Sequence, residues 1–188
     1  MPRFVALLRA VNVGGHVVKM DAPRRIFESL DFAHVETFIA SGNVVFETPS
    51  RDVEDLERRI EERLRDELGY EVATFVRSDV ELAEVAAHQP FAPSDLEAAT
   101  AFNVAFTGEP LDKRAEQKLE GLTTDIDDFR VRGREVYWLC RKRQSQSTFS
   151  NAALERTLGR PSTLRGASTV AKMAAKWGPG RRMEDRGA

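Results

Sequence analysis

The sequence predicts an α+β protein made of two consecutive copies of one fold unit, and three observations support this. Short apolar runs, such as residues 4–8, alternate with longer segments whose apolar residues recur every three or four positions. The first pattern is typical of buried strands and the second of amphipathic helices. Between residues 1 and 77 these elements follow the order β-α-β-β-α-β, and the same order begins again near residue 101. That order predicts a ferredoxin-like unit with an antiparallel sheet, in tandem duplication.

The first unit is expected to cover residues 1–77. Its clearest element is a helix in which Val53, Leu56, Ile60 and Leu64 recur on one face, and Gly69 ends it. Asp21 is the expected N-cap of an earlier helix. The expected elements in chain order are strand 4–8, helix 21–30, strand 35–40, the turn 41–43, strand 44–47, helix 51–68 and strand 71–76.

Residues 78–100 are expected to bridge the two units. Ser78 can cap a short helix that runs to Ala87, and the segment from Pro90 to Pro93 ends it. The second unit, residues 101–166, has strand 102–106, helix 111–119, hairpin strands 126–131 and 135–140, helix 149–158 and strand 162–165. A closing helix, 168–177, and a tail are expected within residues 167–188.

Composition narrows the classes of protein. The chain of 188 residues is 41% apolar, enough for a real core, and no apolar run reaches the roughly 18 residues that span a bilayer. A single cysteine excludes an internal disulfide, and we therefore expect a cytoplasmic protein. The net charge of −2 is unevenly distributed: residues 1–50 sum to 0, residues 51–129 to −12 and residues 130–188 to +10.

A polar segment, residues 9–20, follows the first strand and is the best candidate for a site. In a ferredoxin-like sheet the first strand lies beside the third and fourth, so its C-terminal end meets the turn at 41–43. Gly14 and Gly15 allow close approach of a ligand, and the helix that follows favours an anion at its N-terminus. We expect a phosphate or carboxylate to bind there. The candidate residues are Arg9, Asn12, Gly14, Gly15, His16, Lys19, Ser41, Gly42 and Asn43.

The alternative is that these residues serve only the turns of the fold. Glycines suit turns, Ser-Gly-Asn suits a hairpin, and Arg9 can pair with a local carboxylate. No Walker loop or dinucleotide fingerprint is present, because Gly14-Gly15 lacks the spacing and the following Lys-Ser/Thr. The residues specify neither a reaction nor an oligomeric state.

Several of these segments resemble a known family, the domain of unknown function family 1697. The resemblance lies in residues 9–16, 19–20, 39–46 and 162–173. It implies a duplicated ferredoxin-like α+β fold and no established activity, and it adds Arg165 and Thr169 to the candidate ligand-binding residues. The sequence departs from the family pattern at two places. Ala10 and Val11 stand where Gly and Ile are usual, and Gly166 and Ala167 replace the Asn-Trp pair of the C-terminal motif.

Two other kinds of function are weaker expectations. A basic cluster around the second hairpin, with Tyr137 and Trp138 between its charges, suits a nucleic-acid-binding module. Strand alternation puts these two aromatic residues on opposite faces, and Trp138 is expected to be buried rather than to stack on a base. The basic residues are Arg132, Arg134, Arg141, Lys142 and Arg143. The other alternative is a protein-interaction module in which the acidic and basic regions meet between chains.

Catalytic and metal chemistry have little support in the sequence. Cys140 would need a nearby base to act as a nucleophile, and Arg141 points to the opposite face of the expected strand. The three histidines, His16, His34 and His88, show no metal-ligand spacing. We therefore expect no metal and no cofactor, and only His16 falls in the candidate site.

Overall fold

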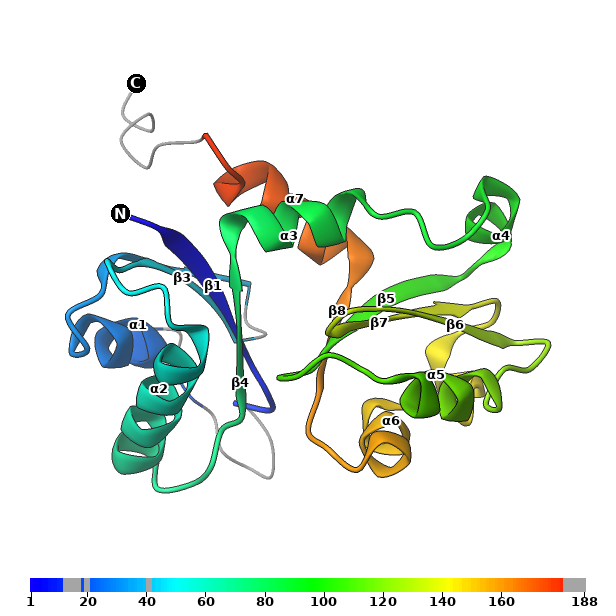
Figure 1. Ribbon diagram of the computed structural model, residues 1–188, viewed down its shortest axis with the longest axis horizontal. Coiled ribbons are helices and arrows are strands. Elements are labelled where there is room, and N and C mark those ends of the chain that lie inside the picture. The colour runs from blue at the N-terminus through cyan, green and yellow to red at the C-terminus, as the bar shows by residue number, and fades with distance from the viewer. Residues whose placement is uncertain (12–17, 19–20, 40–41, 181–188) are drawn as a thin grey trace. The chain divides into compact units, whose positions relative to one another are not determined.

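The structure, a computed structural model, describes residues 1–11, 18, 21–39 and 42–180 of the chain. The chain divides into two compact units, shown with their elements in Figure 1. The first unit consists of Met1–Glu84 with Lys172–Ala188, and the second of Val85–Ala171. Helix α3, Asp79–Ala87, leads from the first unit into the second, and α7, Ala167–Trp177, leads back.

The first unit has the predicted βαββαβ order. Its sheet has the strand order β2-β3-β1-β4, with β1 antiparallel to both β3 and β4. Helices α1 and α2 lie on one face of this sheet (Figure 1). The elements are β1 (Arg3–Leu8), α1 (Asp21–Glu28), β2 (Ala33–Phe38), β3 (Asn43–Glu47), α2 (Val53–Leu68) and β4 (Thr74–Ser78).

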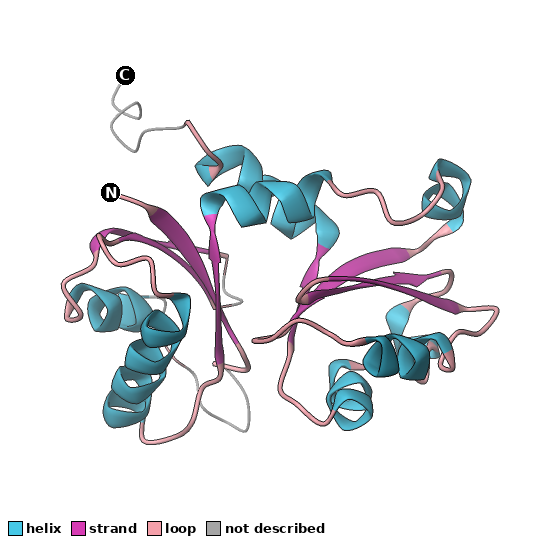
Figure 2. Cartoon of the chain, viewed as in Figure 1, coloured by secondary structure: helices cyan, strands magenta, loops and turns pink. Residues whose placement is uncertain are grey.

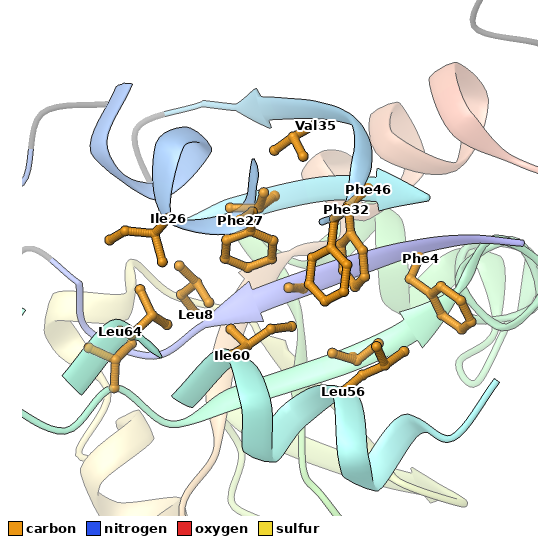
Figure 3. Close-up of a cluster of buried hydrophobic side chains, with 14 of the residues drawn as sticks. Phe4, Leu8, Ile26, Phe27, Phe32, Val35, Phe46, Leu56, Ile60 and Leu64 are labelled. Atoms are coloured by element: carbon orange, nitrogen blue, oxygen red, sulfur yellow. The ribbon is translucent and has the colours of Figure 1, made fainter. Parts of the chain in front are cut away.

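A phenylalanine-rich core joins the sheet of the first unit to its helices. Alternate residues of β1, Phe4, Ala6 and Leu8, face the helices, as the two-residue period of a strand requires. Figure 3 shows the aromatic centre, where the rings of Phe32 and Phe46 stack with 4.5 Å between centroids. Helix α2 adds the apolar stripe predicted from its spacing, and Gly69 ends it with a positive φ of 81°.

The second unit repeats the order. Its sheet has the strand order β6-β7-β5-β8, again with the first strand of the unit, β5, antiparallel to both neighbours. Trp138 and Phe149 anchor its core. The elements are α4 (Pro93–Ala98), β5 (Ala101–Phe106), α5 (Lys113–Glu120), β6 (Asp127–Arg132), β7 (Glu135–Cys140), the 3₁₀ turn η1 (Gln144–Gln146), α6 (Asn151–Leu158) and β8 (Thr163–Gly166).

The duplication extends to the register of the strands. Val5 of β1 lies opposite Arg77 of β4, and Val104 of β5 lies opposite Arg165 of β8. Both arginines are buried. The predicted fold class is thus confirmed, with helices, antiparallel strands and loops in the same succession in each unit (Figure 2).

Several element boundaries differ from the sequence predictions by one to three residues, and three differences have a clear structural cause or consequence. The fourth strand begins at Thr74 rather than Glu71, because pairing with β1 starts at Leu8 opposite Thr74. A short helix, α4, forms after the expected break, with Pro93 at its first position. Asp21 lies in the first turn of α1 and pairs with Arg25, whereas the sequence predicts an N-cap position.

Among the described residues, no helix has the length and apolar character needed to cross a membrane.

In each sheet, nearby side chains form hydrogen bonds with outward backbone groups of one edge strand. At Val76 in β4 the N–H donates to Glu57 Oε1 at 2.7 Å, and the C=O accepts from Arg77 Nη1 at 2.9 Å. At Phe129 in β6 the N–H donates to Asp128 Oδ1 at 2.9 Å, and the C=O accepts from Arg130 Nη1 at 2.7 Å. Backbone groups that are already bonded cannot pair with a strand from another chain, so these edges resist association.

Candidate functional site

Two backbone hydrogen bonds fix the corner of the first sheet where β1 ends. The Leu8 N–H donates to the Gly42 C=O at 2.8 Å, and the Arg9 N–H donates to the Ala73 C=O at 2.8 Å. The chain after β1 is therefore held between the β2–β3 turn and the entry to β4. This confirms the placement expected from the ferredoxin-like topology.

The floor of this corner is tightly packed around Gly42. Its φ is +74°, and a Cβ there would lie 3.1 Å from both Leu8 Cβ and Val11 Cγ2. A side chain would thus be strained by its conformation and by its neighbours. Tyr70 closes the other side, because its hydroxyl donates to the Val11 C=O at 2.9 Å.

The β2–β3 connection carries an unusual backbone. Ile39 has a φ of 57° although it is β-branched, and its side chain is 49% exposed. Ala10, at the start of the 9–20 segment, has a φ of 56°. Asn43 is fully buried and links the two ends of this connection, since its Nδ2 donates to the Phe38 C=O at 2.9 Å. Left-handed backbone at residues other than glycine is rare and gathers at functional sites. The sequence gives no signal for it, because isoleucine disfavours this conformation.

The structure brings three of the predicted site residues together: half-buried Arg9, Gly42 and Asn43. The other predicted residues of the corner lie outside the described residues, and these are Asn12, Gly14, Gly15, His16, Lys19 and Ser41. Close to the start of α1, the exposed Asp21 carboxylate pairs with Arg25 at 3.2 Å. A carboxylate in that first turn already uses the favourable end of the helix dipole.

Arg165 and Thr169 belong to the second unit. The Arg165 guanidinium is buried and donates from Nη1 to Thr163 Oγ1 at 2.8 Å and to the Leu164 C=O at 2.9 Å. Burial lowers the pKa of Arg165 to about 10, so the side chain stays charged at neutral pH. Two of its contacts are made to its own strand, which supports a structural part for this side chain.

The sequence family can be assigned once these features are known. A family model described as "Protein of unknown function (DUF1697)" matches residues 1–137, more than half of the chain. The chain belongs to the DUF1697 family. The match covers every strand of the first unit and reaches β7, while residues 162–173 lie outside it. No curated protein matches the sequence significantly.

A solved structure shares the fold of this DUF1697 protein. It is described as the structure of conserved bacterial protein SP0830 from Streptococcus pneumoniae, and it matches with a TM-score of 0.73 at 21% sequence identity. The match covers 93% of this chain and 97% of that one. At this identity the likeness shows the fold alone, and the two-unit architecture is therefore shared.

The basic hairpin of this DUF1697 protein does not expose its aromatic residues. Trp138 is buried as expected, and its Nε1 donates to Asp127 Oδ1 at 2.8 Å. Tyr137, on the opposite face, is buried as well, so both faces of β7 are covered. Arg141 lies 3.4 Å from Asp95 and 3.9 Å from Asp128. A base-stacking surface like that of RNA-binding sheets is thus not formed by these two rings.

The environment of Cys140 favours a neutral thiol. The side chain is fully buried, and its Sγ donates to the Lys142 C=O at 2.9 Å. Burial raises the pKa of the thiol, and the nearby Asp127 carboxylate raises it further. Since the thiolate is the reactive form, this environment suits a packed core residue better than a nucleophile.

Proposed function

We propose that this DUF1697 protein binds a small anionic ligand, bearing a phosphate or a carboxylate, at the corner after β1. The observation that carries the proposal is a comparison between the two units. In the second unit, residues 107–112 connect β5 to α5, and residues 133–134 connect β6 to β7. The first unit uses residues 9–20 and 39–42 for the equivalent connections, twice the length in each case.

The extra length is not needed to build the fold. In the second unit the Thr107 N–H and hydroxyl both donate to the Arg134 C=O, at 3.0 and 2.9 Å, and the Leu111 N–H donates to the Gly133 C=O at 2.9 Å. In the second unit, the two short connections are therefore hydrogen-bonded to each other. Long connections placed on a rigid scaffold commonly carry binding residues.

The chemistry of the segment supports an anionic ligand. Arg9 supplies a guanidinium at the end of β1, and His16 and Lys19 add further donors by sequence. Guanidinium groups form strong, charge-assisted hydrogen bonds with carboxylates and phosphates. Gly14 and Gly15 allow the backbone to approach such a ligand. Asp21 occupies the first turn of α1, and so the dipole of that helix is not part of the proposal.

Backbone strain also supports a site here. The left-handed conformations of Ala10 and Ile39 cost about 1–3 kcal/mol each and persist only where surrounding structure enforces them. The half-exposed Ile39 side chain would offer an apolar contact to the uncharged part of the ligand.

A cytoplasmic location belongs to the same proposal. The chain has one cysteine, and its thiol is buried and hydrogen-bonded, which suits a protein of a reducing compartment.

Nuclear magnetic resonance on the ¹⁵N-labelled protein tests the proposal. Inorganic phosphate and acetate are titrated separately at constant ionic strength. We expect one of them to shift the amide signals of Arg9, Gly42 and Asn43 in a saturable way. The amides of Thr107 and Arg134, at the closed corner of the second unit, serve as the internal control and are expected to stay unchanged. Equal shifts at both corners, or none at either, would refute the proposal.

A further inference from the structure

The junction of β8 and α7, in the second unit, contains a second group of polar donors. Gly166 is the last residue of β8 and lies directly opposite Asn103 of β5. Residues that face each other across antiparallel strands project from the same face of the sheet, about 5 Å apart. Asn103 and Gly166 therefore lie on the same face of the sheet, and Gly166 has no side chain to fill the space beside the Asn103 side chain.

Asn103 has an unmet hydrogen-bonding need. The residue is only 7% exposed, and its Nδ2 is buried without a hydrogen-bond partner in the part of the chain that the structure describes. A buried donor left unpaired costs roughly 1–3 kcal/mol, so such a group calls for a partner. Trp138, opposite Asn103 on the other side, cannot serve, because its indole is a donor and is bonded to Asp127.

The space beside Gly166 is lined by hydroxyl groups. Apart from the two adjacent residues, a Cβ at Gly166 would have two neighbours within 4 Å among the described residues, Ser168 Oγ at 3.8 Å and Thr169 Oγ1 at 3.9 Å. Both belong to the first turn of α7, an 11-residue helix with no acidic residue in that turn. Gly166 is half-buried and Ser168 is exposed, so the space can be reached from solvent.

The hydrogen-bond donors around Gly166 all favour a negatively charged partner. The first N–H groups of a helix lack intrahelical partners, and the helix dipole favours negative charge beside them. The Asn103 amide and the two hydroxyls add donors from the side chains. At α1 the dipole is met by Asp21, whereas at α7 no carboxylate of the first turn competes with a ligand.

We propose that the space beside Gly166 binds an anionic oxygen, of a phosphate or a carboxylate group, with Asn103, Ser168 and Thr169 as the donors. The missing side chain at residue 166 leaves room for the ligand atom. The site uses residues of the second unit and does not depend on the corner after β1.

The test is a titration of the full-length ¹⁵N-labelled protein with inorganic phosphate and, separately, with acetate, at pH 7 and constant ionic strength. The signals to follow are the side-chain NH₂ pair of Asn103 and the backbone amides of Ser168 and Thr169. We expect a saturable shift with one or both ions. A response to phosphate alone identifies a phosphate ligand, and a response to acetate alone identifies a carboxylate.

Two variants sharpen the result. Gly166→Ala places a methyl group in the space, and Ser168→Ala removes a hydroxyl from an exposed position. Because a hydrogen bond to a charged group contributes about 1.5–3 kcal/mol, Ser168→Ala is expected to weaken binding by roughly tenfold or more. Gly166→Ala is expected to weaken binding as well, because its methyl group occupies the space of the ligand atom. Gly108→Ala is the matched control, since its Cβ position has no neighbour within 4 Å in the described part of the chain, apart from the adjacent residues, and its φ is not in the left-handed region.

Gly108→Ala is expected to bind as the wild type does. The proposal is overturned if neither ion shifts the Asn103 signals. It is equally overturned if Gly166→Ala and Ser168→Ala both bind the ion with wild-type affinity.

Discussion

The Leu8 N–H donates to the Gly42 C=O at 2.8 Å and so joins the end of β1 to the β2–β3 connection. The same bond recurs in the second unit, where the Thr107 N–H donates to the Arg134 C=O at 3.0 Å. Around this shared bond, the connections of the first unit are twice as long as those of the second. The second unit thus shows how short these connections can be in this fold, and the extra residues of the first unit are additions to it.

Gly42 can be tested against Gly133, the glycine of the hairpin turn in the second unit. Gly42→Ala combines a left-handed φ with contacts of 3.1 Å to Leu8 and Val11. Gly133→Ala also has a left-handed φ, of +60°, but its nearest contact among the described residues is Glu135 Oε2 at 3.8 Å. The conformation alone costs about 1 kcal/mol, and overpacking adds about 1–3 kcal/mol. We expect Gly42→Ala to lose clearly more unfolding free energy in urea titrations. Equal losses of unfolding free energy would show that Leu8 and Val11 can move to accept the added methyl group at little cost.

The two tyrosines form another matched pair. Tyr70→Phe removes the hydrogen bond to the Val11 C=O and is expected to lower the unfolding free energy by about 1 kcal/mol. The buried Tyr137 hydroxyl has no partner in the described part of the chain, so Tyr137→Phe is expected to be neutral or stabilising. Denaturant unfolding of both variants measures the difference. A loss at Tyr137 as large as that at Tyr70 would contradict the bonding described for the two hydroxyls.

Alkaline pH provides a separate test of Tyr137. Burial, with a smaller contribution from the Glu135 carboxylate, raises the pKa of Tyr137 to about 12, although Arg132 opposes the shift. A raised pKa means that the stabilisation is complete below the ordinary value near 10 and is lost as the pH rises through about 12. The unfolding free energy of the wild type relative to Tyr137→Phe should therefore fall between pH 10 and 12, by up to about 1.4 kcal/mol per pH unit. A difference independent of pH would show that the phenol ionises freely in the folded protein.

The capped edge of β6 predicts how association can be induced. Asp128 and Arg130 bond the outward N–H and C=O of Phe129, and the double change Asp128→Val, Arg130→Val frees both groups on an apolar edge. We expect this variant to self-associate in light scattering at concentrations where the wild type shows no change in mass. Arg132→Val, an exposed position on the same strand, is the control. Association of the control to the same extent would assign the effect to hydrophobicity alone.

Much of the fold could be predicted because strong local signals agreed with one another. The stripe of Leu56, Ile60 and Leu64 and the helix-ending Gly69 specified α2, and the short apolar runs specified the strands. The start of β4 was missed because pairing with β1 decides it, and the apolar run of that segment begins earlier. Helix α4 was missed because Pro93 and the polar residues that follow it are typical of a loop.

The site was only partly predictable. The position of residues 9–20 beside Gly42 and Asn43 follows from strand order alone, and the structure has this arrangement for the described residues. The left-handed backbone of Ile39 could not be foreseen, because the surrounding structure enforces it against the residue's own preference. Nor could the unmet amide of Asn103, since it depends on the register that places Gly166 opposite.

The most direct test of the proposed ligand site is a titration with phosphate and, separately, with acetate, followed through the amide signals of Gly42 and Asn43 in the wild type, Arg9→Ala and Arg51→Ala. Both changes remove one guanidinium from the first unit, but Arg51 is an exposed residue that precedes α2. Loss of a charge-assisted bond of about 1.5–3 kcal/mol predicts that Arg9→Ala raises the dissociation constant roughly 10- to 100-fold. Arg51→Ala is predicted to leave it unchanged. Equal dissociation constants for the wild type and Arg9→Ala would contradict the central claim.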